Sequence, residues 1–264
     1  MYIRACAIAV IFVCLSVCAW GKNLYVSTTG SDSTTYAVND IDHPWLTVEK
    51  AVTSVEPGDT VYFRAGSYEI ASTIDTISNT NPISESERVV FQNYDGETVN
   101  IATTFDSSTA ESTAAIRVDR DYYSFTGLNL EAAGTFFYFG YTASADYGYI
   151  DSCNIYISVY GGSPNLGCIR YQVDRAIGGR VTNCILHGPG VGDFSTTRNT
   201  AGVFAFRSQG IVIENNEFYN LPRAIFFKHT CVGYDTGISV KNNYIYNVGE
   251  GIQPAGGQPA GFAA

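Results

Sequence analysis

The sequence predicts an all-β protein built as a parallel β-helix, a solenoid whose coils consist of short strands. Three observations predict it. A short motif recurs five times, a second short strand follows each copy, and no amphipathic helix separates the two. The composition agrees, because 19 Tyr, 15 Phe and 26 Gly accompany a single Met, a balance typical of strands and turns.

The chain begins with a pattern typical of a cleaved secretory signal. Arg4 precedes an apolar run from Ala5 to Val17, and small residues follow around Ala19. The run is too short to span a bilayer, which argues against the alternative of a membrane anchor. We therefore expect residues 1–19 to be a signal peptide, residues 20–264 to form one β-helix domain, and the protein to be secreted, either extracellular or periplasmic.

A short helix is expected near the start of the domain. Segment 48–55 places its Val and Ala side chains on one helical face. Thr47 precedes the segment as a capping residue, and Pro57-Gly58 follows as a stop signal. Such an apolar face can cover the open end of a β-solenoid, so we predict an N-terminal capping helix.

The coils are marked by a repeated motif: an apolar residue, paired polar residues and another apolar residue. Its copies start 25, 31, 32 and 27 residues apart, so the motif is constant while the loops vary in length. Propeller blades need about 40 residues, and leucine-rich repeats need Leu at set intervals. The copies are Phe125-Thr-Gly-Leu-Asn-Leu130, Ile150-Asp-Ser-Cys-Asn-Ile155, Val181-Thr-Asn-Cys-Ile-Leu186, Ile213-Glu-Asn-Asn-Glu-Phe218 and Val240-Lys-Asn-Asn-Tyr-Ile245.

A second apolar strand follows each motif, at 136–139, 168–171, 203–206, 224–227 and from 251. Strands that follow one another in one repeated direction without crossover helices define a parallel β-helix. The residues after Ile252 neither complete a coil nor cover its edge. We therefore expect further coils beyond the C-terminal end of this sequence.

Period-two alternation predicts which motif residues point into the coil. Asn216 and Asn243 fall at equivalent inward positions, where their amides would bond buried turn backbone as a ladder. Cys184 and Cys153 continue this stack, and we interpret both as small apolar core residues rather than as a disulfide or a redox pair.

The charge balance excludes several partners. With 15 basic and 25 acidic residues the net charge is −10, which repels nucleic acids and anionic membranes. Four cysteines lie beyond the leader, too few for a disulfide scaffold, and no C-x-x-C pair or Cys/His cluster has zinc spacing.

The first part of the domain resembles the N-terminal cap of the pectate-lyase-like right-handed parallel β-helix superfamily. The resemblance rests on Leu24-Tyr-Val-Ser27 with Gly30-Ser-Asp32, on 44–52, and on the run Pro57-Gly-Asp-Thr-Val-Tyr-Phe-Arg-Ala-Gly-Ser-Tyr68. It implies a right-handed coil and places the apolar strand that follows each motif on a front sheet that binds glycan. It also implies a polysaccharide, possibly anionic, as the partner of a monomer.

Outward residues on that front sheet follow from one alignment, in which Ile225, Phe204, Ile169 and Phe137 point inward. The residues expected outward are Tyr138, Arg170, Ala205 and Phe226, followed by Gly140, Gln172, Arg207 and Lys228. Neighbouring parallel strands are about 4.8 Å apart, so we expect the Arg207 and Lys228 side chains to stack, with Arg170 diagonally near. A basic cluster there is unusual in so acidic a chain.

This cluster suggests β-elimination from a uronic-acid polymer. Such a reaction needs a group that neutralises the carboxylate and a base that removes the neighbouring carbon-bound proton. We expect Arg207 to bind the carboxylate, because a guanidinium matches it in two-point geometry, and Lys228 to be the base. An amine is a base only when it is unprotonated, so the reaction requires a groove that excludes water or alkaline conditions.

The sequence bears on two other kinds of chemistry, glycoside hydrolysis and calcium binding. A glycoside hydrolase needs paired carboxylates, and no Asp or Glu takes an expected outward front-sheet position. Loop acids Asp174, Asp193 and Asp235 could instead hold calcium. Related lyases carry Lys before Arg along the coils with acids shortly before the Lys, whereas here Arg207 precedes Lys228 and those acids are absent.

A second column of outward side chains lies at the end of the strand that closes each motif: Tyr156, His187, Tyr219 and Tyr246. Stacked aromatic side chains suit sugar rings, and exposed Tyr is also common strand filler. We expect Tyr138, Arg170, His187 and Tyr219 to contact substrate. A non-catalytic glycan-binding or cell-surface module of the same fold is the alternative function.

Overall fold

The computed structural model describes residues 21–255 except 161–164, 173, 191–198 and 229–236. The expected signal peptide and two of the loop acids considered for calcium, Asp193 and Asp235, lie outside these described residues. Within them, no helix is both long and apolar enough to cross a membrane.

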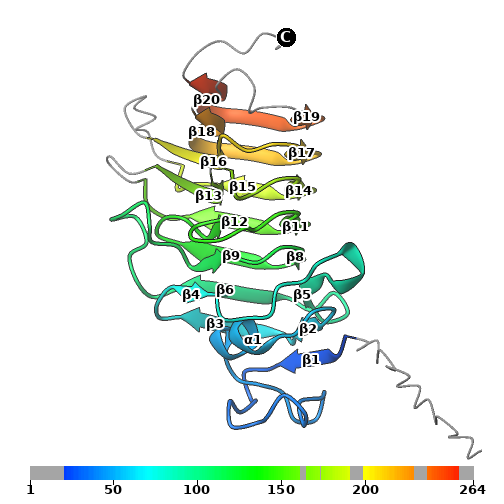
Figure 1. The fold of residues 1–264 in the computed structure, drawn as a ribbon. Helices are drawn as coiled ribbons and strands as arrows, with labels where there is room; N and C mark the ends of the chain where they lie inside the picture. The colour runs from blue at the N-terminus through cyan, green and yellow to red at the C-terminus, as the bar shows by residue number, and fades with distance from the viewer. Residues whose placement is uncertain (1–20, 161–164, 173, 191–198, 229–236, 256–264) are drawn as a thin grey trace, which may run out of the picture.

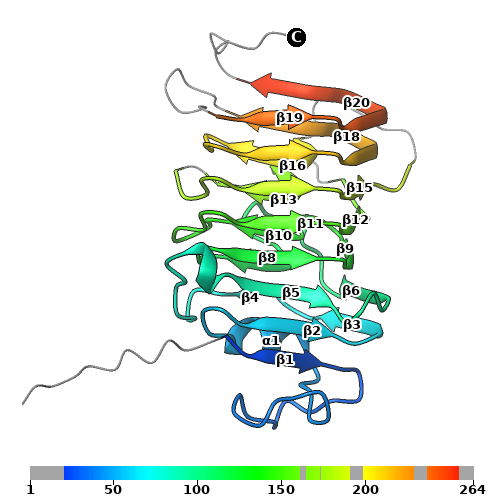
Figure 2. The same ribbon diagram turned by 90° about the vertical axis from the view of Figure 1, so that its right-hand side faces the viewer.

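The chain winds into stacked coils whose short strands form the faces of a solenoid (Figures 1 and 2). All strand pairs are parallel, including those of the first face. An eight-stranded sheet forms that face, with β1 (Asn23–Val26), β2 (Thr60–Phe63), β5 (Val89–Asn93), β8 (Tyr123–Thr126), β11 (Tyr149–Asp151), β14 (Arg180–Thr182), β17 (Val212–Glu214) and β19 (Ser239–Lys241).

A twelve-stranded sheet forms the other two faces, which join through the long strand β18 (Glu217–Lys228) and its partner β20 (Tyr244–Ala255). The second face holds β3 (Gly66–Ile70), β6 (Val99–Thr103), β9 (Asn129–Ala132), β12 (Asn154–Ile157), β15 (Ile185–His187) and the start of β18. The front sheet holds β4 (Ile74–Asp75), β7 (Ile116–Val118), β10 (Phe137–Phe139), β13 (Leu166–Tyr171), β16 (Thr200–Phe206) and the end of β18.

The core consists of inward side chains stacked from coil to coil. Phe91 and Phe125 are stacked with ring centroids 4.9 Å apart, and Phe139 and Tyr171 with centroids 5.0 Å apart. All four are at most 2% exposed, and burying one such side chain contributes about 1.5–3 kcal/mol. The expected coil of short strands around an apolar core is confirmed.

The asparagine ladder is confirmed and its motif explained. Asn216 Oδ1 accepts from the Cys184 N–H (2.9 Å), and Asn216 Nδ2 donates to the Val181 carbonyl (2.9 Å) and to Asn243 Oδ1 (2.9 Å). The preceding residue of the pair, Asn215, has φ of +59°. Asn tolerates this left-handed conformation better than most residues, so the first polar residue makes the turn and the second bonds its backbone.

Cys153 and Cys184 continue the ladder as expected. Cys153, Cys168 and Cys184 are buried free thiols, and the Cys153 N–H lies 3.5 Å from Cys184 Sγ. Burial raises the pKa of Cys153 to about 12, so this thiol stays protonated and acts as a small apolar core residue.

The capping helix α1 (Val48–Ser54) lies at the base of the coil (Figure 1). Thr47 Oγ1 accepts from the Lys50 N–H (3.1 Å), as expected of an N-cap. Val48, Ala51 and Val52 are buried. The helix therefore covers the apolar end of the first coil and confirms the predicted cap.

Candidate functional site

The register of the front sheet differs from the expected one at β16. Val203 pairs with Ile169 and Ile225, whereas Phe204 pairs with Arg170 and Phe226. The expectation that Phe204 points inward is therefore wrong. Every residue from Ala201 to Ala205 is buried, so alternation of apolar and polar residues does not distinguish Val203 from Phe204 as the inward residue.

This shift separates Arg207 from Lys228 on the sheet. Phe206, not Arg207, pairs with Lys228, so the expected stacking of the two cations on adjacent strands is wrong. Arg207 comes one residue after β16 with φ of +46°, and its N–H donates to the Lys228 carbonyl (3.3 Å). The two residues are neighbours through this backbone contact, at the end of the front sheet.

Tyr138 and Arg170 pair across β10 and β13 as expected. The Arg170 guanidinium carbon lies 4.5 Å from the Tyr138 ring centroid and 5.3 Å from that of Phe204. However, Tyr138 is 2% and Arg170 is 3% exposed, so neither side chain presents an open surface to a polymer.

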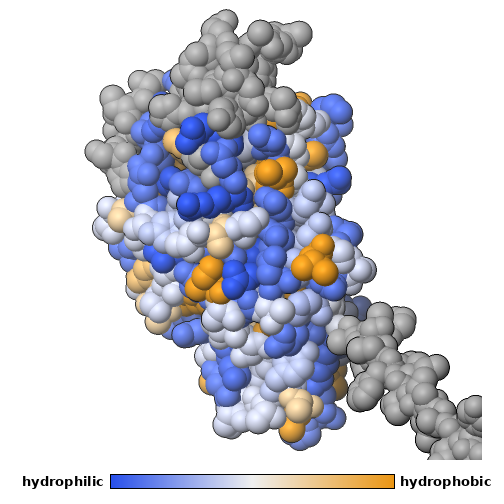
Figure 3. All heavy atoms as spheres, in the orientation of Figure 1, coloured by the Kyte–Doolittle hydropathy of each residue, from blue (hydrophilic) through white to orange (hydrophobic). Residues whose placement is uncertain are grey.

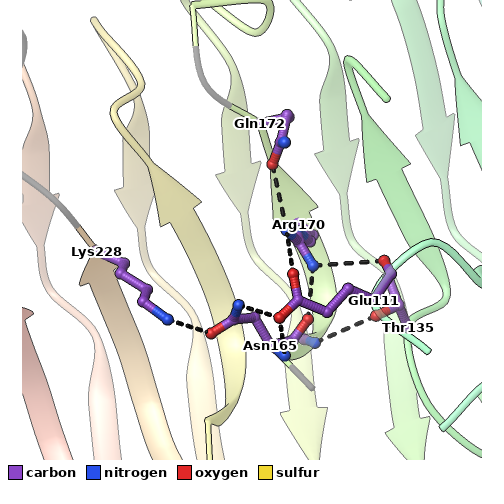
Figure 4. A network of polar contacts seen from close by, with 7 residues as sticks. Glu111, Thr135, Asn165, Arg170, Gln172 and Lys228 are labelled. Carbon is purple, nitrogen blue, oxygen red and sulfur yellow. Dashed lines mark hydrogen bonds and ion pairs between the residues drawn. The ribbon is translucent and has the colours of Figure 1, made fainter. Parts of the chain in front are cut away.

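A polar network spans the loops over β13 and reaches β18 (Figure 4). Arg170 donates to the Asn165 carbonyl (2.7 Å) and forms an ion pair with Glu111 (3.4 Å). Asn165 Nδ2 donates to Glu111 Oε1, and Asn165 Oδ1 accepts from Lys228 Nζ (2.6 Å). Gln172 Oε1 accepts from Arg170 (3.3 Å). The network fixes the amine of Lys228 above the front sheet.

Sequence reasoning missed Glu111 and Asn165. Both lie in loops that carry no repeat or spacing signal, and they meet although they are 54 residues apart. Only the position of Arg170, a cation expected to need an acidic partner when buried, could have indicated such a residue.

An open depression lies beside this network at the end of the front sheet. Its lining residues are Gln172, Asp174, Arg175, Phe206 and Arg207. Arg175 is held by a hydrogen bond to the Tyr141 carbonyl (2.8 Å). Two guanidinium groups, those of Arg175 and Arg207, and one carboxylate, that of Asp174, line the hollow, and Lys228 follows on the neighbouring strand as the pairing partner of Phe206. The depression is therefore suited to a polar anionic ligand.

The second aromatic column forms as expected, but on the second face. The ring centroids of Tyr156, His187, Tyr219 and Tyr246 follow one another at 5.0, 4.8 and 5.2 Å. His187 and Tyr219 therefore lie on a different face from Lys228, and the residues expected to contact one substrate are divided between two faces.

Stability should depend on pH through His187. Burial lowers its pKa from the ordinary value, about 6.5, so the folded protein favours neutral imidazole. The contribution of neutral His187 to the free energy of unfolding is fully present above its ordinary pKa. It is lost as the pH falls toward the lower pKa of the folded state. We expect His187→Tyr to flatten the fall in melting temperature between about pH 7 and pH 5. An unchanged slope would contradict this role.

Among the described residues, no group of three or more His, Cys, Asp or Glu side chains converges on a possible metal position. Of the loop acids considered for calcium, only Asp174 is described, and it lines the depression next to Arg175 and Arg207.

No family model and no curated protein matches the sequence. Solved structures do match. The crystal structure of pectate lyase Pel9A matches at 15% identity and a TM-score of 0.54, over 86% of this chain and 62% of that one. The complex of XylC with xylose matches at 10% identity and a TM-score of 0.60, over 88% and 63%. The chain spans less than two thirds of both proteins. The likeness confirms the expected right-handed parallel β-helix fold.

Proposed function

We propose that the protein binds a uronic-acid-containing polysaccharide at the end of the front sheet and cleaves it by β-elimination. The observation that carries this proposal is the position of Lys228: its amine is held by Asn165, and its strand neighbour Phe206 lines a depression together with Arg175 and Arg207. In a chain of net charge −10, these cations attract a carboxylate where the global field does not.

In the proposed reaction, Arg207 binds the uronate carboxylate in two-point geometry and stabilises the negative charge that develops on it. Lys228 in its neutral form takes the proton from the carbon beside the carboxylate. The electron pair of that C–H bond forms a carbon–carbon double bond, the bond from the next carbon to the glycosidic oxygen breaks, and that oxygen takes up a proton from water.

The buried residues act as positioning groups. Asn165 accepts from the Lys228 amine and is itself held by Glu111 and Arg170. Tyr138 packs against the Arg170 guanidinium. We assign Arg170 and Tyr138 the role of holding Asn165 and Glu111 in place rather than direct contact with substrate.

The fold likeness supports a carbohydrate as the substrate. One matched structure is a pectate lyase, and the other holds xylose. The face of the molecule in Figure 3 is mainly hydrophilic with small, separate hydrophobic patches, as suits a polar polymer. We further propose that the protein is a monomer that acts outside the cytoplasm, after removal of residues 1–19.

A second candidate is a non-catalytic glycan-binding module, and one observation favours it. The Lys228 amine already donates to Asn165, and Arg170 is paired with Glu111. These cations would then fix a loop and attract anionic glycan without any proton transfer.

Ultraviolet absorbance tests the proposal, because elimination creates an unsaturated uronate that absorbs there. The purified protein is mixed with alginate, pectate and chondroitin, each with and without calcium. We expect absorbance to rise with at least one polymer. Binding without a rise would favour the module, and neither binding nor a rise from folded protein would overturn both candidates.

A further inference from the structure

A second depression lies on the second face, away from the cations of the front sheet. It opens over β6, β9 and β12, which Figure 2 shows stacked along one side of the coil. The residues that line it with polar or aromatic side chains are Asn100, Asn129, Glu131, Asn154, Tyr156 and His187.

Tyr156 is the end of the aromatic column that faces this depression. His187 and Tyr219 each have one ring on either side, at 15–29° to their neighbours. Both faces of those two rings are therefore occupied. Tyr156 stacks only on His187 among the described aromatic rings, and on its other side the paired residue is Glu131. One face of Tyr156 therefore forms a wall of the hollow.

The floor of the depression carries a row of amides. Asn100, Asn129 and Asn154 are paired in register on β6, β9 and β12, about 4.8 Å apart. Asn129 Nδ2 donates to Asn100 Oδ1 (3.2 Å), and Asn154 Oδ1 lies 3.1 Å from His187 Nε2. Each amide has two donors and an acceptor with two lone pairs, so hydrogen-bonding capacity remains for a ligand.

The charge at the depression selects against an anion. Glu131 is exposed, and no Lys or Arg is among the described residues that line the hollow. Burial lowers the pKa of His187, which favours its neutral form. A uronate would meet carboxylate repulsion here, whereas a neutral sugar would meet an aromatic face, amides and one hydrogen-bond acceptor.

We propose that this depression binds one neutral pyranose unit of a glycan, which stacks on the outer face of Tyr156 and bonds to Asn129, Asn154 and Glu131. The apolar face of a pyranose fits an aromatic ring, and its hydroxyls both donate and accept, as the amide row requires. The site is independent of β-elimination at the front sheet. It would hold a neutral unit or side chain of a polymer.

Titration calorimetry with neutral xylotetraose, mannotetraose and galactotetraose, and with anionic trigalacturonate, tests this site. We expect saturable binding of at least one neutral oligosaccharide, and about tenfold weaker binding by Tyr156→Ala. Tyr246→Ala is the matched control, because Tyr246 ends the same column on the opposite side and is outside the hollow. It should leave the affinity unchanged.

Two further variants separate this site from the fold and from the front sheet. Glu131→Gln keeps the stack and removes the charge, so it should strengthen trigalacturonate binding in the hollow. Lys228→Ala should leave neutral-sugar binding unchanged, whatever its effect on elimination. The proposal is overturned if wild type binds no neutral oligosaccharide, if Tyr246→Ala weakens binding as much as Tyr156→Ala, or if Glu131→Gln leaves trigalacturonate binding unchanged.

Discussion

Replacing Lys228 with alanine is expected to lower kcat/KM for uronate-polymer cleavage about 10³-fold, a typical contribution of a positioned general base. The amine projects from the end of β18 and is fixed by Asn165 at 2.6 Å. No Lys is among the described residues that line the nearby depression, so no second amine there can replace it. Initial rates of absorbance increase at several substrate concentrations measure the change.

Two variants give this measurement its controls. Lys228→Gln keeps a donor for Asn165 but cannot take a proton, so it should lose activity as severely as Lys228→Ala. Lys241→Ala removes an exposed lysine of β19 that pairs with Glu214 at 3.8 Å on the first face, and it should keep wild-type activity. Activity retained in Lys228→Gln would show that Lys228 only positions the loop.

Replacing Asn216 with alanine is expected to lower the free energy of unfolding by about 3 kcal/mol, because each buried polar group left without a partner costs about 1–3 kcal/mol. The side chain is 2% exposed. Its loss leaves the Cys184 N–H and the Val181 carbonyl without their ladder partners. Urea-induced unfolding followed by circular dichroism measures the change.

Asn100→Ala is the matched control for the ladder, because Asn100 is an exposed strand asparagine on the second face. Its free energy of unfolding should change by less than about 0.5 kcal/mol, as for most surface substitutions. Equal effects of the two variants would contradict the ladder as a source of stability.

The coil itself was predictable because its stability depends on a pattern the sequence repeats. Each motif needs inward apolar residues with period two and a polar pair at the turn, as in Asn215-Asn216 and Asn242-Asn243. The capping helix was predictable because Thr47 and an apolar helical face are local signals. These features depend on a few neighbouring residues in the chain.

The front sheet was only partly predictable. In β16 the run Val203-Phe-Ala-Phe206 is apolar at successive positions, so alternation could not fix its phase. The outer side of that strand is covered as well, since Ala201, Phe204 and Phe226 form a small separate apolar cluster. A sheet that is buried on both sides reads as a continuous apolar run.

The contacts of the candidate site were not predictable from spacing. Lys228 and Asn165 are 63 residues apart, and they meet because Asn165 is held beside the side chain of Arg170. The aromatic column was predictable from the repeat, but which ring face is open was not, because that depends on the order of the coils. The column ends at Tyr156 since β9 supplies Glu131 instead of an aromatic residue.

The mass spectrum of the shortest cleavage products tests the central claim most directly. Digests of pectate, alginate and chondroitin by the purified protein are compared with the hydrolysis products of the same polymers. Elimination predicts oligosaccharides lighter by the mass of one water than hydrolysis products of the same length. Products of full hydrated mass, or no products from a polymer that the protein binds, would contradict the account.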